Sequence, residues 1–191
     1  MNGAHRLGIA ADVLFAGRSG RTRRHRRRDA RLQALVRHAR TSSPYYRHLY
    51  RGLPPGPVAL DSLPPVGKPQ LMAAFDDWVT DPGITLEGVQ GFLADPDRIG
   101  QPYRRCFACS SSGTTGHPGI FLHDERATAV YEALMVRIDL DWLSAGEWVD
   151  LARKGLRWAA VAGTGGHYGG VGWLEWERHR SRWRRHCYRM F

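Results

Sequence analysis

Residues 110–119 read Ser110-Ser111-Ser112-Gly113-Thr114-Thr115-Gly116-His117-Pro118-Gly119, a run of small hydroxyl and glycine residues that a proline closes. Glycine lets the backbone adopt conformations closed to other residues and approach a ligand closely. Successive backbone N–H groups and hydroxyls in such a loop can converge on an anion. The aromatic and small residues of 103–109 and the apolar residues of 119–122 predict two adjacent strands joined by this loop. The pattern therefore indicates a phosphate-binding loop; the structural alternative is a hairpin with a flexible tip.

The order Ser-Gly-Thr-Thr-Gly-x-Pro in residues 112–118 resembles the phosphate-binding signature of the adenylate-forming ligases, which activate carboxylates as acyl-adenylates. No Gly-Lys-Ser/Thr follows, so the loop is not the Walker loop of the P-loop nucleoside triphosphatases. Upstream motifs occur in the order found in the amino-terminal part of the phenylacetate–coenzyme A ligase branch. They are Ser43-Pro44-Tyr45-Tyr46-Arg47, Leu63-Pro64-Pro65-Val66-Gly67-Lys68 and Phe75-Asp76-Asp77-Trp78-Val79-Thr80-Asp81-Pro82. The resemblance covers residues 31–178 and departs at Gly119, where a lysine often follows the loop proline.

This resemblance implies an α/β fold: the amino-terminal part of a ligase large domain, incomplete, with helices packed on a mixed sheet. It implies ATP, magnesium and coenzyme A as cofactors. Phosphate binding falls on the loop residues Ser110, Ser111, Ser112, Gly113, Thr114, Thr115 and Gly116. The glycine-rich turn at residues 163–170 corresponds to a region that borders the acyl pocket, which assigns Gly166, His167 and Tyr168 to the substrate pocket; the alternative is a structural turn.

The family's later segments supply the adenine and ribose motifs, the acidic magnesium ligand and a catalytic lysine, and none has a counterpart here. We therefore assign no catalytic residue and no metal ligand. The first hypothesis is an amino-terminal fragment of an acyl-coenzyme A ligase, inactive alone, whose partner is a missing carboxyl-terminal half or a second chain. The second is a non-catalytic basic module that binds nucleotides or nucleic acid.

The net charge is +10, from 28 basic and 18 acidic residues, and arginines cluster near both ends of the chain. The clusters predict a basic, flexible arm at residues 1–30 and a basic tail at 179–191, and the resemblance implies a partial AMP-binding domain at 31–178. Solvated ends are the favoured interpretation of the clusters, and non-specific binding of polyanions is the alternative.

No apolar run approaches the ~20 residues that span a bilayer, so we expect no membrane span. Cys106 and Cys109 have Cys-x-x-Cys spacing but lack a second pair of cysteines or histidines, which favours two half-buried thiols in a strand over a zinc or redox site. With three cysteines and no disulfide framework, the expected location is the cytoplasm.

Apolar periodicity predicts helices around residues 32–39, 86–93 and 127–138, and the apolar stripe of the last is expected to be core. Ser43 and Pro44 read as the start of another helix. The proline-rich residues 53–69 predict an extended connector. Lys68 is expected to open the next helix as a surface lysine. Residues 156–162 predict a buried strand.

Overall fold

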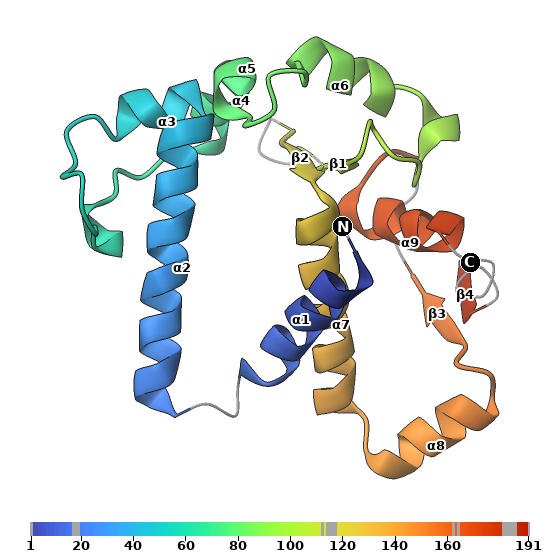
Figure 1. Ribbon diagram of the computed structural model, residues 1–191. Helices are drawn as coiled ribbons and strands as arrows, with labels where there is room; N and C mark the ends of the chain where they lie inside the picture. Colours follow the sequence, from blue (N-terminus) through green and yellow to red (C-terminus); the bar gives the residue numbers. More distant parts are fainter. Residues whose placement is uncertain are drawn as a thin grey trace.

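The computed structural model describes residues 2–16, 20–111, 113, 118–161, 163, 165–180 and 187–190. Within these residues the protein is rich in helices and carries two small β-sheets (Figure 1). The helices are α1 (Gly3–Leu14), α2 (Arg21–Ser42), α3 (Pro44–Leu49), α4 (Lys68–Ala73), α5 (Phe75–Trp78), α6 (Leu86–Leu93), α7 (Glu125–Trp142), α8 (Ala145–Arg153) and α9 (Gly169–Arg180), with short 3₁₀ turns η2 (Leu60–Ser62) and η3 (Pro96–Arg98). The strands are β1 (Phe107–Ser110), β2 (Ile120–His123), β3 (Trp158–Ala160) and β4 (Tyr188–Met190). Over this part of the chain, no helix is both long and apolar enough to cross a membrane.

The predicted hairpin around the hydroxyl-rich loop is present. Strands β1 and β2 pair antiparallel, from Phe107 opposite His123 to Ser110 opposite Ile120. The first strand is shorter than predicted, because residues 103–106 form a tight turn instead. Tyr103 and Cys106 exchange both backbone hydrogen bonds, at 3.0 and 2.9 Å, across an Arg104 in the left-handed region (φ +54°). The prediction of adjacent strands is confirmed, and the start of the first moves to Phe107.

A single mixed sheet was expected, and the described residues do not form one. Strands β3 and β4 make a separate parallel pair, in the register Trp158 opposite Tyr188. Among the described residues, the outer edge of β1 is bridged at Ser110 by Tyr168 alone, and helix α9 begins at the next residue. The chain therefore combines helices with two short two-stranded sheets.

The strand predicted at residues 156–162 is shorter than expected and is not buried. Leu156 has a φ of +53°, so the extended segment begins only at Trp158. Ala159 is exposed, and Val161 just beyond the strand is 95% exposed. Its apolar composition suggested a covered strand, but the tertiary layer that would cover it is not formed by the described residues.

The hydrophobic core lies beside β2 and is built from short helices. Phe75 of α5, Ile84, Val89 of α6 and Ile120 of β2 form one buried cluster. The predicted helix at 86–93 is confirmed, with the Thr85 hydroxyl accepting a hydrogen bond from the Gly88 N–H at 3.2 Å. This capping fixes the start of α6 and turns Val89 inward, where it is fully buried.

Two further expectations about local structure hold. Ser43 caps α3 and is fully buried, because its hydroxyl accepts from the Tyr46 N–H (3.3 Å) and donates to the Asp77 carbonyl oxygen (3.0 Å). Residues 53–69 form a connector that holds only the 3₁₀ turn η2 before Lys68 opens α4.

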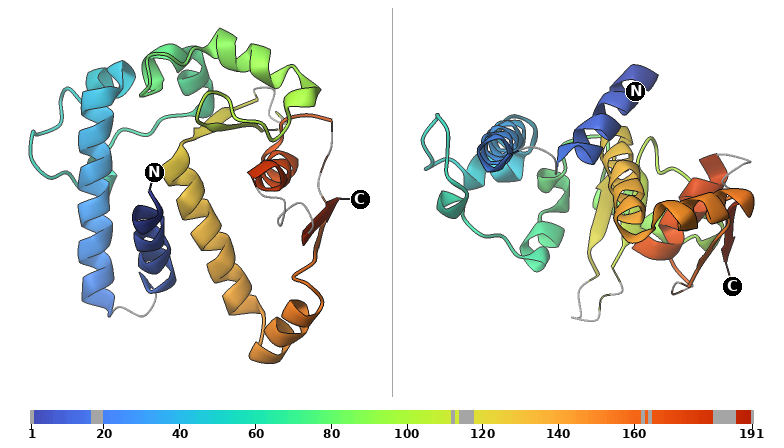
Figure 2. Two further views of the ribbon diagram at one scale, coloured as in Figure 1. Left: turned by 45° about the vertical axis from the view of Figure 1, so that its right-hand side comes forward. Right: turned by 90° about the horizontal axis from the view of Figure 1, so that it is seen from below.

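Most of the described residues between 2 and 30 lie in helices. Asn2 caps α1, and its side chain accepts from the His5 N–H at 3.0 Å. Helix α1 packs along α7, while α2 begins at Arg21 and runs as a separate long helix (Figure 1, Figure 2). Arginine is a good helix former, which explains why the helix starts well before the predicted apolar face.

Helix α7 contains the helix predicted at residues 127–138, but the face that it buries is not the expected one. Its buried residues are Thr128, Ala129 and Ala133. The apolar stripe that was expected to be core is largely exposed, with Leu134 and Ile138 each 40% exposed and Met135 46% exposed. The buried positions of α7 are therefore small residues, although its periodicity pointed to the larger apolar side chains.

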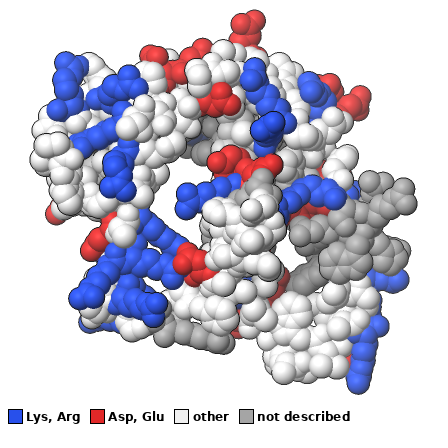
Figure 3. Space-filling view, viewed as in Figure 1, with Lys and Arg blue, Asp and Glu red and all other residues white. Residues whose placement is uncertain are grey.

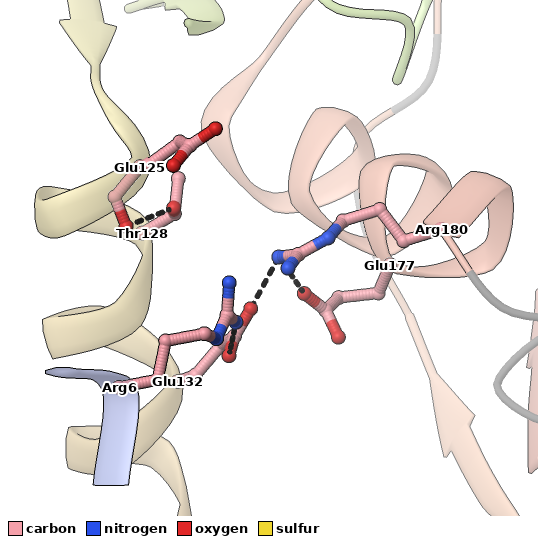
Figure 4. Close-up of polar contacts among 6 residues, drawn as sticks. All are labelled: Arg6, Glu125, Thr128, Glu132, Glu177 and Arg180. Atoms are coloured by element: carbon pink, nitrogen blue, oxygen red, sulfur yellow. Dashed lines mark hydrogen bonds and ion pairs between the residues drawn. The ribbon is translucent and has the colours of Figure 1, made fainter. Parts of the chain in front are cut away.

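An ion-pair cluster ties α1, α7 and α9 together (Figure 4). The carboxylate of Glu132 binds Arg6 of α1, with 2.5 Å between Nη2 and Oε2, and also binds Arg180 of α9. Arg180 lies 3.8 Å from Glu177, whose side chain is 3% exposed. The cluster holds two guanidinium groups and two carboxylates, so its charges balance and it holds the helices together.

We predict that Glu132→Gln destabilises the protein by about 1–3 kcal/mol, because it removes charged hydrogen bonds from two partly buried arginines at once. Urea unfolding followed by circular dichroism measures this. The exposed Glu87→Gln is the matched control and should change the free energy of unfolding by less than about 0.5 kcal/mol. Equal losses in both variants would contradict a special role for Glu132.

Candidate functional site

The base of the hydroxyl-rich loop is closed by two hydrogen bonds between Ser111 and Gly119. The Ser111 hydroxyl accepts from the Gly119 N–H at 2.7 Å, and the Ser111 N–H donates to the Gly119 carbonyl oxygen at 2.9 Å. These bonds extend the β1–β2 ladder by one pair and bring the two ends of the loop together. Ser112, Thr114, Thr115 and Gly116 lie outside the described residues.

Gly113 is the loop position where glycine is required. Its φ is +69°, and an added Cβ would lie 3.3 Å from both Cδ and N of Pro118. A side chain there would be strained by the backbone and crowded by the proline. Glycine at this position therefore permits the close approach of Gly113 to Pro118.

Lys68 lies beside the loop base, which the sequence prediction of a surface lysine missed. A Cβ added to Gly119 would lie 2.9 Å from Lys68 Cδ and 3.2 Å from the Phe121 ring. The lysine stem thus passes across the position where the resembled family often carries its own lysine. The usable signal in the sequence was the departure from the family pattern at Gly119, together with a lysine at the end of the upstream motif at residues 63–68.

The glycine-rich turn at Gly166, His167 and Tyr168 is joined directly to the loop. The Ser110 N–H donates to the His167 carbonyl oxygen at 2.8 Å, and the ring of Tyr168 lies against Gly166. The imidazole of His167 points elsewhere. It is 3% exposed, its Nε2–H donates to the Asp95 carbonyl oxygen at 2.9 Å, and it packs on Phe92 with 5.1 Å between ring centroids.

An aromatic cavity of about 380 Å³ opens on one face of the hairpin. The strands contribute two residues each, and α7 and α9 close the other sides. Its lining is Phe107, Cys109, Phe121, His123, Tyr131, Met135, Gly169 and Trp173. Tyr131 and Met135 belong to the apolar stripe that the sequence assigned to the core, and none of Gly166, His167 and Tyr168 is among the lining residues.

The aromatic rings around this cavity contact one another. His123 stacks on Phe107 with 5.8 Å between centroids and meets Tyr131 edge-on at 5.0 Å. Trp173 lies 5.5 Å from Phe107 and 5.9 Å from Tyr131. Walls of this kind suit a flat apolar or aromatic group, with few polar atoms to orient it.

Burial favours the neutral forms of Cys109 and His123, two of the residues that line the cavity. Burial raises the pKa of the Cys109 thiol to about 11, so it is not a thiolate nucleophile near neutral pH. Burial lowers the pKa of His123, and the neighbouring Asp124 opposes this only in part. All three cysteines are free thiols, and no three histidine, cysteine or acidic side chains of the described residues gather to hold a metal ion.

Comparison with protein-family models, with curated proteins and with solved structures found no match.

We predict that His123 makes the protein less stable as the pH falls. Because its pKa in the folded protein lies below that of the unfolded chain, stability is retained above about pH 6.5 and lost as the pH falls toward the folded value. The free energy of unfolding, measured at pH 7.5 and pH 5.5, should decrease more in the wild type than in His123→Phe. The exposed His25→Gln serves as control and should keep the wild-type slope; a His123→Phe slope equal to that of the wild type would contradict the prediction.

Proposed function

We propose that this chain is the amino-terminal portion of an ATP-dependent, carboxylate-activating ligase of the acyl-adenylate type. In this proposal the loop at residues 110–119 binds nucleotide phosphates, and the aromatic cavity receives the apolar part of an aromatic carboxylate. The observation that carries it is the shared hairpin: β1 and β2 supply both the loop and one wall of the cavity.

In the hairpin register, the residues of the cavity and those of the loop lie a short distance apart, which supports the proposal. Phe107 pairs with His123 and Cys109 with Phe121, so all four side chains stand on one face, the face of the cavity. Ser111 is two residues beyond Cys109, or about 7 Å along the strand. A carboxylate held in the cavity would therefore lie within one small ligand's length of the loop.

The described part of the loop suits phosphate groups. Small residues leave its backbone accessible, the base is held closed, and the Lys68 stem runs beside Gly119. We propose that Lys68 supplies the positive charge that Gly119 does not. When bound, ATP would supply the adenylyl group to which the carboxylate is joined, with loss of pyrophosphate.

The described residues give less support for magnesium and coenzyme A, the other cofactors that the resemblance implies. The described residues bring no three acidic, histidine or cysteine side chains together for magnesium, so we place its ligand in a carboxyl-terminal half or a second chain. Coenzyme A is assigned to the same missing part. The free thiols suit a reducing cytoplasm, which we propose as the location.

Calorimetric titration with ATP and magnesium tests the loop. We expect weak binding by the wild type and a loss of at least about threefold in affinity in Thr114→Val/Thr115→Val and in Lys68→Gln, since each removes a donor or a charge. The exposed Thr22→Val is the matched control and should bind as the wild type does. Adenosine should not compete with ATP. Equal binding by the wild type and both loop variants would remove the loop from the site.

The purified chain should not form acyl-adenylates. Attack of a carboxylate on the α-phosphate needs a metal and cations to stabilise the developing charge, and we assign those to the missing part. A pyrophosphate-release assay over aryl and fatty acids measures this directly. Robust turnover by the chain alone would show that the catalytic groups are present here after all.

A further inference from the structure

A second hollow, of about 370 Å³, lies between α2, the end of α1 and α7, and it shares no lining residue with the aromatic cavity. Arginines dominate it. The lining residues are Ala16, Arg24, Arg27, Arg28, Arg31 and Arg137. We call this the arginine groove. Figure 3 shows Lys and Arg side chains gathered over this lower part of α2.

The helical repeat and one distant residue build the groove. Arg24, Arg27, Arg28 and Arg31 stand at i, i+3, i+4 and i+7, which places them on one face of α2. Arg137 comes from α7 and is held toward the same hollow, where its Nη1 donates to the Val13 carbonyl oxygen of α1 at 3.3 Å. The arginines therefore converge from different helices instead of following one another along a charged run.

The carboxylates around the groove do not balance these arginines. Asp12 of α1 pairs with both Arg27 and Arg31. Asp29 pairs with Arg28 at 2.8 Å, and Asp141 lies 4.0 Å from Arg137. Among the described residues, five guanidinium groups thus face three carboxylates. Asp29 and Asp141 are 53% and 72% exposed, and exposed ion pairs contribute at most about 1 kcal/mol each, so a stronger anion can displace them.

We propose that the arginine groove binds the backbone phosphates of a nucleic acid. The planar guanidinium group donates two parallel hydrogen bonds to phosphate oxygens, which makes arginine suited to this ligand. Arg24 to Arg31 spans about 10 Å along the helix axis, more than a single phosphate group covers. A duplex carries one negative charge per about 1.7 Å of its axis and so presents several phosphates over that length.

The same lining argues against reading of the base sequence. Of the described residues, Ala16 alone lines the groove besides the arginines, so none of them offers an aromatic side chain for stacking on bases. Binding through phosphates alone is independent of sequence and falls steeply with salt. This inference does not depend on the proposed ligase function, because the groove and the loop involve different residues.

Two double variants that remove the same charge distinguish binding in the groove from binding to any run of arginines along α2. Arg24→Gln/Arg28→Gln removes two lining residues, whereas Arg23→Gln/Arg26→Gln removes two exposed arginines from another side of the same helix. Binding to a fluorescein-labelled 20-base-pair duplex is followed by anisotropy from 50 to 300 mM salt, with helicity checked by circular dichroism. At 100 mM salt the groove variant should lose at least about tenfold in affinity, and its log–log salt slope should become shallower by about 1.8; the control should stay within about twofold.

A third variant tests the role of the Asp12 carboxylate, which pairs with two arginines of the groove. Asp12→Asn frees Arg27 and Arg31 from their partner and should tighten duplex binding, whereas a purely structural role for Asp12 would weaken it or leave it unchanged. Equal losses in the two arginine pairs would overturn the groove. No binding by the wild type at 50 mM salt, a preference between two unrelated duplexes that persists at 300 mM, or binding to phosphatidylserine vesicles but not to duplexes would each overturn the proposal of a nucleic-acid backbone ligand.

Discussion

The antiparallel pairing of β1 with β2 is the constraint on which the rest of the structure depends. Side chains alternate across a strand, so each strand of the hairpin serves two faces. Ile120 and Leu122 face the buried cluster around Phe75 and Val89, while Phe121 and His123 face the aromatic cavity. A shift of register by one residue would exchange these faces and open the Ser111–Gly119 closure. Core, cavity and loop are therefore fixed by the same few hydrogen bonds.

Helix α7 extends this constraint to the rest of the chain. It follows β2 directly, and Asp124 caps it by accepting from the Ala127 N–H at 2.7 Å. One side of the helix supplies Tyr131 and Met135 to the cavity, and another binds α1 and α9 through Glu132. Helix α9, which supplies Trp173 to the cavity, packs on β1 and is also linked to α7 by the ion pair between Arg180 and Glu132. The site and the charge cluster are coupled through one helix.

What the sequence could predict was local. The hairpin, the Ser43 cap and the helix at 86–93 follow from turn residues, capping residues and periodicity, which act over a few positions. Which face of a helix is buried depends on the neighbour that arrives from elsewhere in the chain. The stripe of α7 was therefore assigned to the core, although the smaller Ala129 and Ala133 face the interior. His167 was assigned to the pocket because its turn resembles a region that borders the acyl pocket in the ligase family, but only the fold shows that its imidazole contacts Asp95 and Phe92.

The two anion sites proposed here rest on different physics. The loop offers backbone N–H groups, hydroxyls and one lysine, which act as oriented dipoles at short range. The arginine groove offers net charge near the surface, whose attraction extends over about 10 Å and is screened by salt. The affinity for phosphate groups should therefore depend weakly on ionic strength at the loop and strongly at the groove. No arginine lies in residues 110–119, so the charge of +10 gives the loop no support, and the loop is judged on its geometry.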